Sequence, residues 1–387
     1  MAHNFDSRRS VFISLYMVLT GYAVLVGIPV ISTAWVTKAG FSQAEAGALA
    51  AADLGGFSLG AILCAIFINR IDRRHLVIGA ALFAAWMNTS CVFVTDHNWV
   101  LMLRLITGIA SGVYTAVAVA SLGAHSNPSR AYSWVLFAFA VSQAFELSLL
   151  PELSMHGIYT VFACSYALSI PFSWWVVPRA VDTNPRQLPT PRARQTPAYI
   201  PWLVLTAILF AYINIGAYWT YIELASLDSN ASPDRVGHVL VLASVFSILG
   251  CLVAAWINDR FGLTRPLTLT LLAQALTALV LVKGIDDTTF TVSVLGFNFL
   301  WMLSDILQLT VIAKIDPTGR YAALVPGAQG IGQIIGPTAA AALLASQADY
   351  RGVFTLCALA ATIAALFYAM IALGLRQSSG HHTNAPL

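Results

Sequence analysis

Five ionisable side chains lie inside long apolar stretches of this sequence: Asp53, Arg104, Glu146, Glu223 and Asp305. A charged group at the centre of a bilayer costs about 2.5–3.5 kcal/mol on insertion scales. A membrane span therefore has little reason to hold one without a partner or a task. Carboxylates in such places take up protons or bind solutes, and an arginine binds anions or holds a carboxylate. The pattern predicts solute or proton transport.

Three of these residues are expected in one layer of the membrane. Asp53, Arg104 and Glu146 each lie four or five residues from the same end of a predicted span, at about 1.5 Å of rise per residue. Arg104 is then able to pair with Asp53 or with Glu146. Protonation of that carboxylate would release the arginine, which is a proton-coupling switch. The structural alternative is a fixed salt bridge that braces the helices.

The span near 290–314 carries a polar stripe formed by Asn298, Trp301, Asp305 and Gln308. Their spacings of 3, 4 and 3 residues place them within an arc of about 80° on a helix. Such a stripe should face a cavity or another helix rather than lipid. We expect Asp305 to bind solute or a proton; interhelical hydrogen bonding is the alternative.

Further polar and aromatic side chains within the spans are candidate solute contacts, because they offer hydrogen bonds or flat rings. They are Tyr16, Thr20, Asn214, Tyr218, Tyr221, Gln329 and Gln333. Packing or bonding to a neighbouring helix is the alternative for each. Gly336 and Pro337 allow close approach and bending, so we assign them to movement between helices, with plain packing as the alternative.

The composition identifies the solvent of the chain. Hydrophobic residues make up 58% and charged residues 10%, whereas a soluble domain carries about 25% charged residues. We therefore expect an all-α integral membrane protein surrounded by a lipid bilayer. The net charge of +3 is too small to favour nucleic acid as a partner. The five cysteines lie in apolar stretches without pairing or metal-ligand spacing, so no disulfide or metal is expected.

Several function classes lack their motifs. The sequence contains no H-E-x-x-H, no G-x-S-x-G and no G-x-x-x-x-G-K-[ST] pattern. We therefore expect neither an intramembrane enzyme nor an ATP-driven pump, and no cofactor; a proton gradient is the expected energy source. A receptor or scaffold without transport remains an alternative, although it would not need several ionisable residues around one cavity.

Twelve apolar segments are long enough to span a bilayer. They lie near 11–36, 48–68, 76–95, 99–124, 131–150, 158–178, 200–227, 236–257, 267–284, 290–314, 321–346 and 353–375. The chain divides into an N-terminal six-helix bundle (1–178), a cytoplasmic linker (179–199), a C-terminal bundle (200–376) and a disordered cytoplasmic tail (377–387). If both termini are cytoplasmic, fifteen of the 20 Lys and Arg residues lie inside and four outside. This asymmetry predicts a multi-pass protein of a bacterial inner membrane.

The two sets of six spans contain similar loops. Residues 68–74 read I-N-R-I-D-R-R and residues 257–265 read I-N-D-R-F-G-L-T-R. The loops are offset by 258 − 69 = 189 residues, about half of the chain. A repeat of this kind places a solute site near the midplane, between two six-helix halves.

Several motifs resemble those of the major facilitator superfamily, in particular its bacterial sugar- and drug-efflux-like members. Asp259-Arg260-Phe261-Gly262, followed by Arg265, is similar to the family's loop signature. The motif Arg104-x-x-x-Gly108-x-x-x-Gly112 is similar to that of its fourth helix. Gly332-x-x-x-Gly336-Pro337 is similar to the motif of its exporters, although exporters carry it on the fifth helix and this chain carries it on the eleventh. Residues 316–320, D-P-T-G-R, are similar to the loop before that helix.

This resemblance implies a twelve-helix fold with a central cavity, and a gating role for Asp259 and Arg260 at a helix N-terminus. We expect a monomeric secondary transporter that moves a small organic solute by alternating access with proton coupling. A proton-antiport efflux pump for drug-like or metabolic compounds is the alternative. Arg104 would suit an anionic solute, whereas Asp53 and Asp305 would suit a cation or a sugar-like hydrogen-bond donor.

Overall fold

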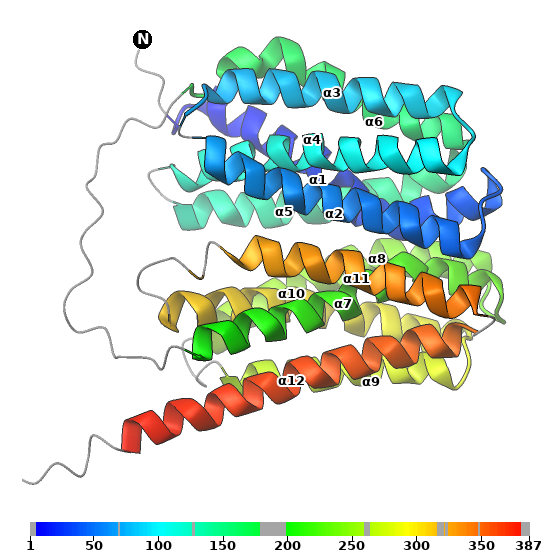
Figure 1. Cartoon of the computed structure of the whole chain (residues 1–387), viewed down its shortest axis with the longest axis vertical. Helices are drawn as coiled ribbons and strands as arrows, with labels where there is room; N and C mark the ends of the chain where they lie inside the picture. The colour runs from blue at the N-terminus through cyan, green and yellow to red at the C-terminus, as the bar shows by residue number, and fades with distance from the viewer. Residues whose placement is uncertain are drawn as a thin grey trace, which may run out of the picture.

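The computed structural model describes residues 5–68, 70–125, 128–178, 199–258, 264–315, 321, 324–346 and 349–380. These residues form helices and connecting turns, with no strand among them (Figure 1). The α-helices are α1 (Arg8–Thr37), α2 (Gln43–Phe67), α3 (Arg73–Phe93), α4 (His97–Gly123), α5 (Pro128–Leu149), α6 (Met155–Ser169), α7 (Ile200–Leu227), α8 (Pro233–Asn258), α9 (Thr264–Val282), α10 (Asp287–Ile315), α11 (Val325–Ala345) and α12 (Tyr350–Gly380).

The predicted spans agree with these helices within a few residues at most ends. The sixth span ends early: α6 stops at Ser169, and a 3₁₀ segment (Ile170–Trp175) follows, because Pro171 has no N–H to continue the ladder. The eleventh begins at Val325, four residues later than predicted. The twelfth continues to Gly380, four residues into the predicted tail. The linker residues 179–198 lie outside the described residues.

Short polar side chains define where several helices begin. Ser42 accepts a hydrogen bond from the Glu45 N–H (3.2 Å), and the Glu45 carboxylate accepts one from the Ser42 N–H (2.8 Å), which is a capping box. Asp96 accepts from the Trp99 N–H at the start of α4, and Ser154 accepts from the Gly157 N–H at the start of α6. Asp286, before α10, accepts from the N–H of Thr289 (2.8 Å), and this bond lowers the pKa of the Asp286 carboxyl.

In the described part of the chain, nine helices are long and apolar enough to cross a membrane. The other three α-helices have visible reasons for a weaker signal. α6 has only 15 residues, and α5 carries Gln143 and Glu146 among several serines. α11 is rich in glycine and alanine and carries Gln329 and Gln333. Small and polar residues on a span favour contact with other helices over contact with lipid.

The helices form two sets of six that lie one above the other in Figure 1. In the first set α2 packs along α4, and in the second set α7 packs along α11 and α8 along α10. α2 against α11, α5 against α8 and α1 against α7 join the sets. We call the end of the bundle where α1 begins the Arg8 end, and the opposite end the Lys38 end.

Glycines allow the backbones of α2 and α4 to touch. A Cβ atom at Gly108 would meet the carbonyl oxygen of Asp53, and one at Gly112 would meet the carbonyl oxygen of Phe57. Gly60 on α2 lies equally close to the carbonyl group of Ile109 on α4. The glycines of the fourth-span motif therefore serve close helix packing in this protein.

We expect Gly112→Ala to destabilise the protein by about 1–3 kcal/mol, because the added methyl group would push α2 and α4 apart. Gly79→Ala on α3 is the matched control, since a Cβ at Gly79 meets no atom within 4 Å. That control should be neutral or slightly stabilising, because alanine favours the helix. Thermal unfolding of the purified proteins compares the two. Equal midpoints would show that the α2–α4 contact is looser than described.

Candidate functional site

A cluster of polar side chains lies between α7, α10 and α11, near the middle of the second set of helices. The hydroxyl of Tyr212 lies 3.0 and 2.9 Å from the two carboxylate oxygens of Asp305 and donates to that group. The Gln329 amide donates to the same hydroxyl at 2.8 Å. Asp305 is only partly buried, and no described basic side chain lies within salt-bridge distance of it. A carboxylate in this setting is able to accept a proton or a donor group of a solute.

The rest of the predicted α10 stripe extends this cluster in both directions. Asn298 accepts a hydrogen bond from Gln143 of α5 at 3.3 Å, so it lies at the interface between the two sets. Both amide atoms of Gln308 have no hydrogen-bond partner. Trp301 is 3% exposed and Gln308 is 1% exposed. The side chains of the stripe therefore reach into the protein interior, and part of their hydrogen-bonding capacity is unused.

Arg104 pairs with Asp53, which is one of the two partners considered from the sequence. The Arg104 Nε–H donates to Asp53 Oδ2 at 2.8 Å, and a second guanidinium N–H bonds the same oxygen. A third donates to Asn88 of α3 at 2.8 Å. Both members of the pair are almost fully buried, at 1% and 2% exposure. Asp53, Arg104 and Asn88 thus join α2, α4 and α3.

Glu146 has a different environment. Ser142, one turn earlier on α5, donates to one carboxylate oxygen, and the other oxygen has no partner. That second oxygen lies beside Gly27 of α1. Glu146 is buried without a basic side chain in salt-bridge distance among the described residues. It is therefore separate from both the Arg104 pair and the Asp305 cluster.

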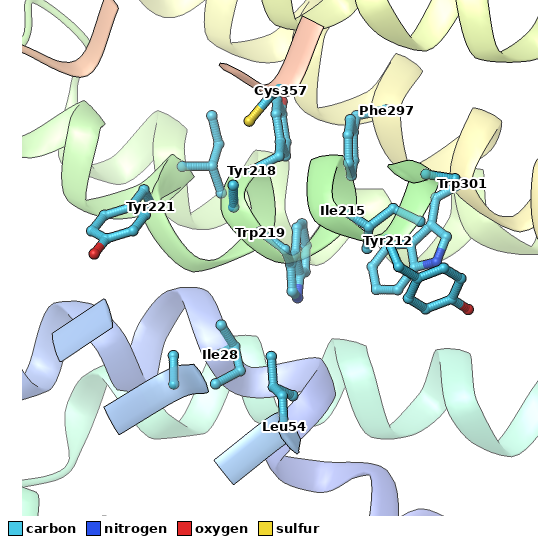
Figure 2. Close-up of a cluster of buried hydrophobic side chains, with 14 of the residues drawn as sticks. Ile28, Leu54, Tyr212, Ile215, Tyr218, Trp219, Tyr221, Phe297, Trp301 and Cys357 are labelled. Carbon is cyan, nitrogen blue, oxygen red and sulfur yellow. The ribbon is translucent and has the colours of Figure 1, made fainter. Parts of the chain in front are cut away.

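The candidates on α7 point in different directions. Tyr218 stacks on Phe297 (3.7 Å between ring centroids) and bonds the Ser293 hydroxyl at 2.7 Å. Figure 2 shows its side chain turned toward Cys357, away from Ile28 and Leu54 of the first set. Asn214 is fully buried, and both of its amide atoms lack a partner. Solute contact by Tyr218 and Asn214 stays a prediction.

The remaining candidates contact neighbouring helices, except Thr20, for which only burial is seen. Tyr16 donates to the Ser165 carbonyl of α6 at 2.8 Å, and Thr20 is buried. Gln333 accepts from Ser58 of α2 at 3.4 Å. A Cβ at Gly336 would meet the Ile213 carbonyl oxygen of α7, which makes this glycine part of the α7–α11 contact.

Pro337 lies inside α11 opposite Gly216 of α7. Asp259 and Arg260, the predicted gating pair, lie outside the described residues.

Tyr212 was not among the candidates from the sequence. Its partner Asp305 is 93 residues away, and it does not share the spacing of Asn214, Tyr218 and Tyr221. A tyrosine in a span is usually a packing residue, so its residue type gave no signal. A search that considered tyrosines on every face of this span, and not only on the face of Asn214 and Tyr218, would have included Tyr212.

Three side-chain hydrogen bonds join the two sets of helices toward the Lys38 end. Trp219 donates to the Val26 carbonyl (3.2 Å), and Tyr221 donates to the Gln43 carbonyl (3.0 Å). The Gln43 amide also donates to Asp228 (3.3 Å). Figure 2 shows Trp219 directed at the first set of helices. These three hydrogen bonds join the two sets at this end.

Toward the Arg8 end, the hydrogen bonds between the two sets reach only to Gln333 and Gln143 in the described chain. There α1 and α5 border a groove of about 560 Å³, lined mostly by apolar side chains, with Arg8 and His125 among the polar ones.

We expect Gly47→Ala to weaken the closure at the Lys38 end. A Cβ at Gly47 would meet the Tyr221 hydroxyl, and it would lie 3.1 Å from Ala341 Cβ. In a variant whose own cysteines are replaced, Leu54→Cys reports the change through its reaction rate with a charged maleimide. The rate should rise in Gly47→Ala. An unchanged rate would show that this contact does not hold the end closed.

Comparison with known proteins places the chain in a family. A profile of the Major Facilitator Superfamily matches residues 11–321 and 204–386. A gentisate transporter of Corynebacterium glutamicum is 20% identical over 375 residues, covering 91% of this chain and 84% of the relative. A gallate transporter of Pseudomonas putida is 23% identical over 384 residues, covering 84% and 83%.

Among solved structures, the nucleoside transporter NupG, as its D323A mutant, matches with a TM-score of 0.75 and 13% identity. The match covers 93% of this chain and 99% of that one, so the two share a fold. The family profile, the two six-helix sets and the fold agree with one another. The chain belongs to the Major Facilitator Superfamily.

Proposed function

We propose that this protein is a proton-coupled secondary transporter that moves a small organic solute by alternating access. The relatives with the names gentisate transporter and gallate transporter support a small organic solute, as does the shared fold of a nucleoside transporter. The proposal places the Arg8 end in the cytoplasm of a bacterial cell, because Lys and Arg concentrate in the loops at that end. The transporter acts as a monomer.

The observation that carries the proposal is the Asp305–Tyr212–Gln329 cluster. It holds a partly exposed carboxylate at mid-membrane without a basic partner among the described residues. An unpaired charge at this depth is costly, so a membrane span has little reason to hold one unless it serves a purpose. Proton uptake neutralises Asp305, and proton release restores an acceptor for a solute. Both steps fit a coupled transporter.

The closure at the Lys38 end supports alternating access. In the present conformation Trp219 and Tyr221 join the two sets at that end. A transport cycle would break these contacts and form new ones toward the Arg8 end. Because each set is closely packed within itself, the cycle needs movement mainly at the interface of α1, α2 and α5 with α7, α8 and α11.

The test is flux in proteoliposomes with an imposed pH gradient, with gentisate, gallate and uridine as radiolabelled probes. Accumulation driven by inward proton flow indicates symport, and extrusion against that flow indicates exchange. Either result should disappear when a protonophore collapses the gradient. Flux that is insensitive to the gradient for every transported probe would refute proton coupling. Absence of flux for every probe that binds would refute the transport function.

A further inference from the structure

The carboxyl group of Glu146 lies buried between α5 and α1 and has one hydrogen-bond partner. The residue is 7% exposed. Its Oε1 atom bonds the Ser142 hydroxyl, and its Oε2 atom has no partner. A Cβ atom at Gly27 of α1 would lie only 3.1 Å from Oε2. The glycine at this position therefore leaves the space in which the carboxyl group of α5 lies.

The surroundings of Glu146 offer no positive charge to a carboxylate. α1, α4 and α8 pack on α5, yet no described basic side chain lies within salt-bridge distance of Glu146. Arg104 of α4 is bound to Asp53 instead. Tyr166 of α6 interacts electrostatically with Glu146, but its hydroxyl donates to Ser111 at 2.6 Å. A buried carboxylate without a partner is so costly that the group takes up a proton and becomes neutral.

The position of Ser142 fits a protonated Glu146. The Ser142 hydroxyl lies within hydrogen-bond distance of two oxygens, Glu146 Oε1 and the Leu19 carbonyl of α1 (3.4 Å for the second). A hydroxyl has a single proton to donate, so the direction of its bond to Glu146 depends on the charge of that group. When Glu146 is protonated, its O–H donates to Ser142, and Ser142 donates to Leu19. Each O–H then has an acceptor.

The two helices that enclose Glu146 also carry contacts between the two sets of helices. Gln143, three residues before Glu146 on α5, donates to Asn298 of α10 at 3.3 Å. Val26 of α1, next to the glycine that faces Glu146, accepts from Trp219 of α7 at 3.2 Å. A movement of the second set that breaks these bonds therefore acts on α1 and α5, on either side of the carboxyl group.

From this geometry we propose that Glu146 is a second proton-binding residue of the transporter. The proposal rests on the proton-coupled transport proposed above, in which Asp305 of the second set binds the first proton. Glu146 is protonated in the present conformation. When α1 and α5 move apart, water reaches the carboxyl group, its O–H bond breaks, the proton passes to water, and a carboxylate remains until the helices pack again. Each set of helices then carries one proton in the cycle.

Infrared spectroscopy of the purified full-length protein tests the protonated state. A protonated carboxyl group has a C=O stretching band that a carboxylate lacks. At about pH 7, where an ordinary glutamate is ionised, subtraction of the Glu146→Gln spectrum from that of the original protein should leave this band. Glu152→Gln is the matched control and should leave none, because its side chain is exposed just after α5. A difference spectrum of Glu146→Gln without the band would overturn the proposal.

Flux in proteoliposomes tests whether the proton is exchanged. A pH-sensitive dye and a radiolabelled probe on the same vesicles give the number of protons moved per solute, for whichever of gentisate, gallate and uridine the original protein accumulates. Glu146→Gln should lower this ratio about twofold, because an amide takes up no proton. Glu146→Asp retains an acid and should retain the ratio. An unchanged ratio in Glu146→Gln, or equal losses in both variants, would overturn the proposal.

The remaining outcomes are also decisive. Arrest of flux in Glu146→Gln, with flux retained in Glu146→Asp, would support the proposal, because a group that cannot release its proton would stop the cycle. Absence of gradient-driven flux in the original protein would refute proton-coupled transport itself. Gradient-driven flux with a ratio that Glu146→Gln leaves unchanged would refute only the role of Glu146, and coupling through Asp305 would stand.

Discussion

Replacement of Asp305 by asparagine should abolish uphill, proton-driven transport while the protein remains folded. The amide has nearly the shape of the carboxyl group and still offers an oxygen to the Tyr212 hydroxyl, so the cluster keeps its main contact. It cannot take up a proton at any working pH. Accumulation of a transported probe under an inward proton gradient should fall to the level of protein-free liposomes.

Two further variants separate this effect from general damage. Asp287→Asn lies at the exposed start of α10 and should accumulate the probe as the original protein does. Tyr212→Phe removes the hydroxyl that bonds Asp305 but leaves the carboxyl group, so coupling should weaken without vanishing. Accumulation at the original level in Asp305→Asn would remove Asp305 from the coupling site.

Replacement of Arg104 by methionine should destabilise the protein by about 3–5 kcal/mol. The change leaves the Asp53 carboxylate buried without its partner, and an uncompensated buried charge is much more costly than a buried apolar pair. The double variant Asp53→Leu with Arg104→Met should recover most of the loss, because both charges are gone. Thermal unfolding in detergent compares the stability of the original protein, the Arg104→Met variant and the double variant.

The same double variant decides between the two roles considered for the pair. Full proton coupling in a folded double variant would identify a brace between α2 and α4. Loss of coupling at normal stability would identify a switch. Arg351→Ala is a control for general loss of positive charge, because its pair with Asp349 is exposed and should contribute at most about 1 kcal/mol. Equal instability of the single and double variants would contradict the electrostatic account.

Much of the helical layout follows from the sequence because each span is a long apolar run. The α10 stripe was also readable, since Asp305 and its polar neighbours share one face of a helix. Pairing of Arg104 with Asp53 was one of two alternatives, because both carboxylates lie at similar depth. Only the packing of α2 along α4, through Gly108 and Gly112, selects Asp53.

The directions of the α7 side chains could not be read in this way. Residues 211–222 of α7 are all buried, so the helix is enclosed on every side and no polar face distinguishes the cavity. A spacing of 4 and 3 residues links Asn214, Tyr218 and Tyr221, yet Tyr218 packs toward α10 and α12. Tyr212, on another face of α7, reaches Asp305.

The backbone contacts between α2 and α4, and between α7 and α11, have a mechanical consequence. Helices that touch through carbonyl groups cannot slide past each other without first separating, so each set resists shear. Each set then rotates as a rigid body, so a small rotation at one end also displaces the other end. A rotation that begins at the Asp305 cluster would in this way reach Tyr221 of the same set, and the Tyr221 side chain would pass it to Gly47 of the first set.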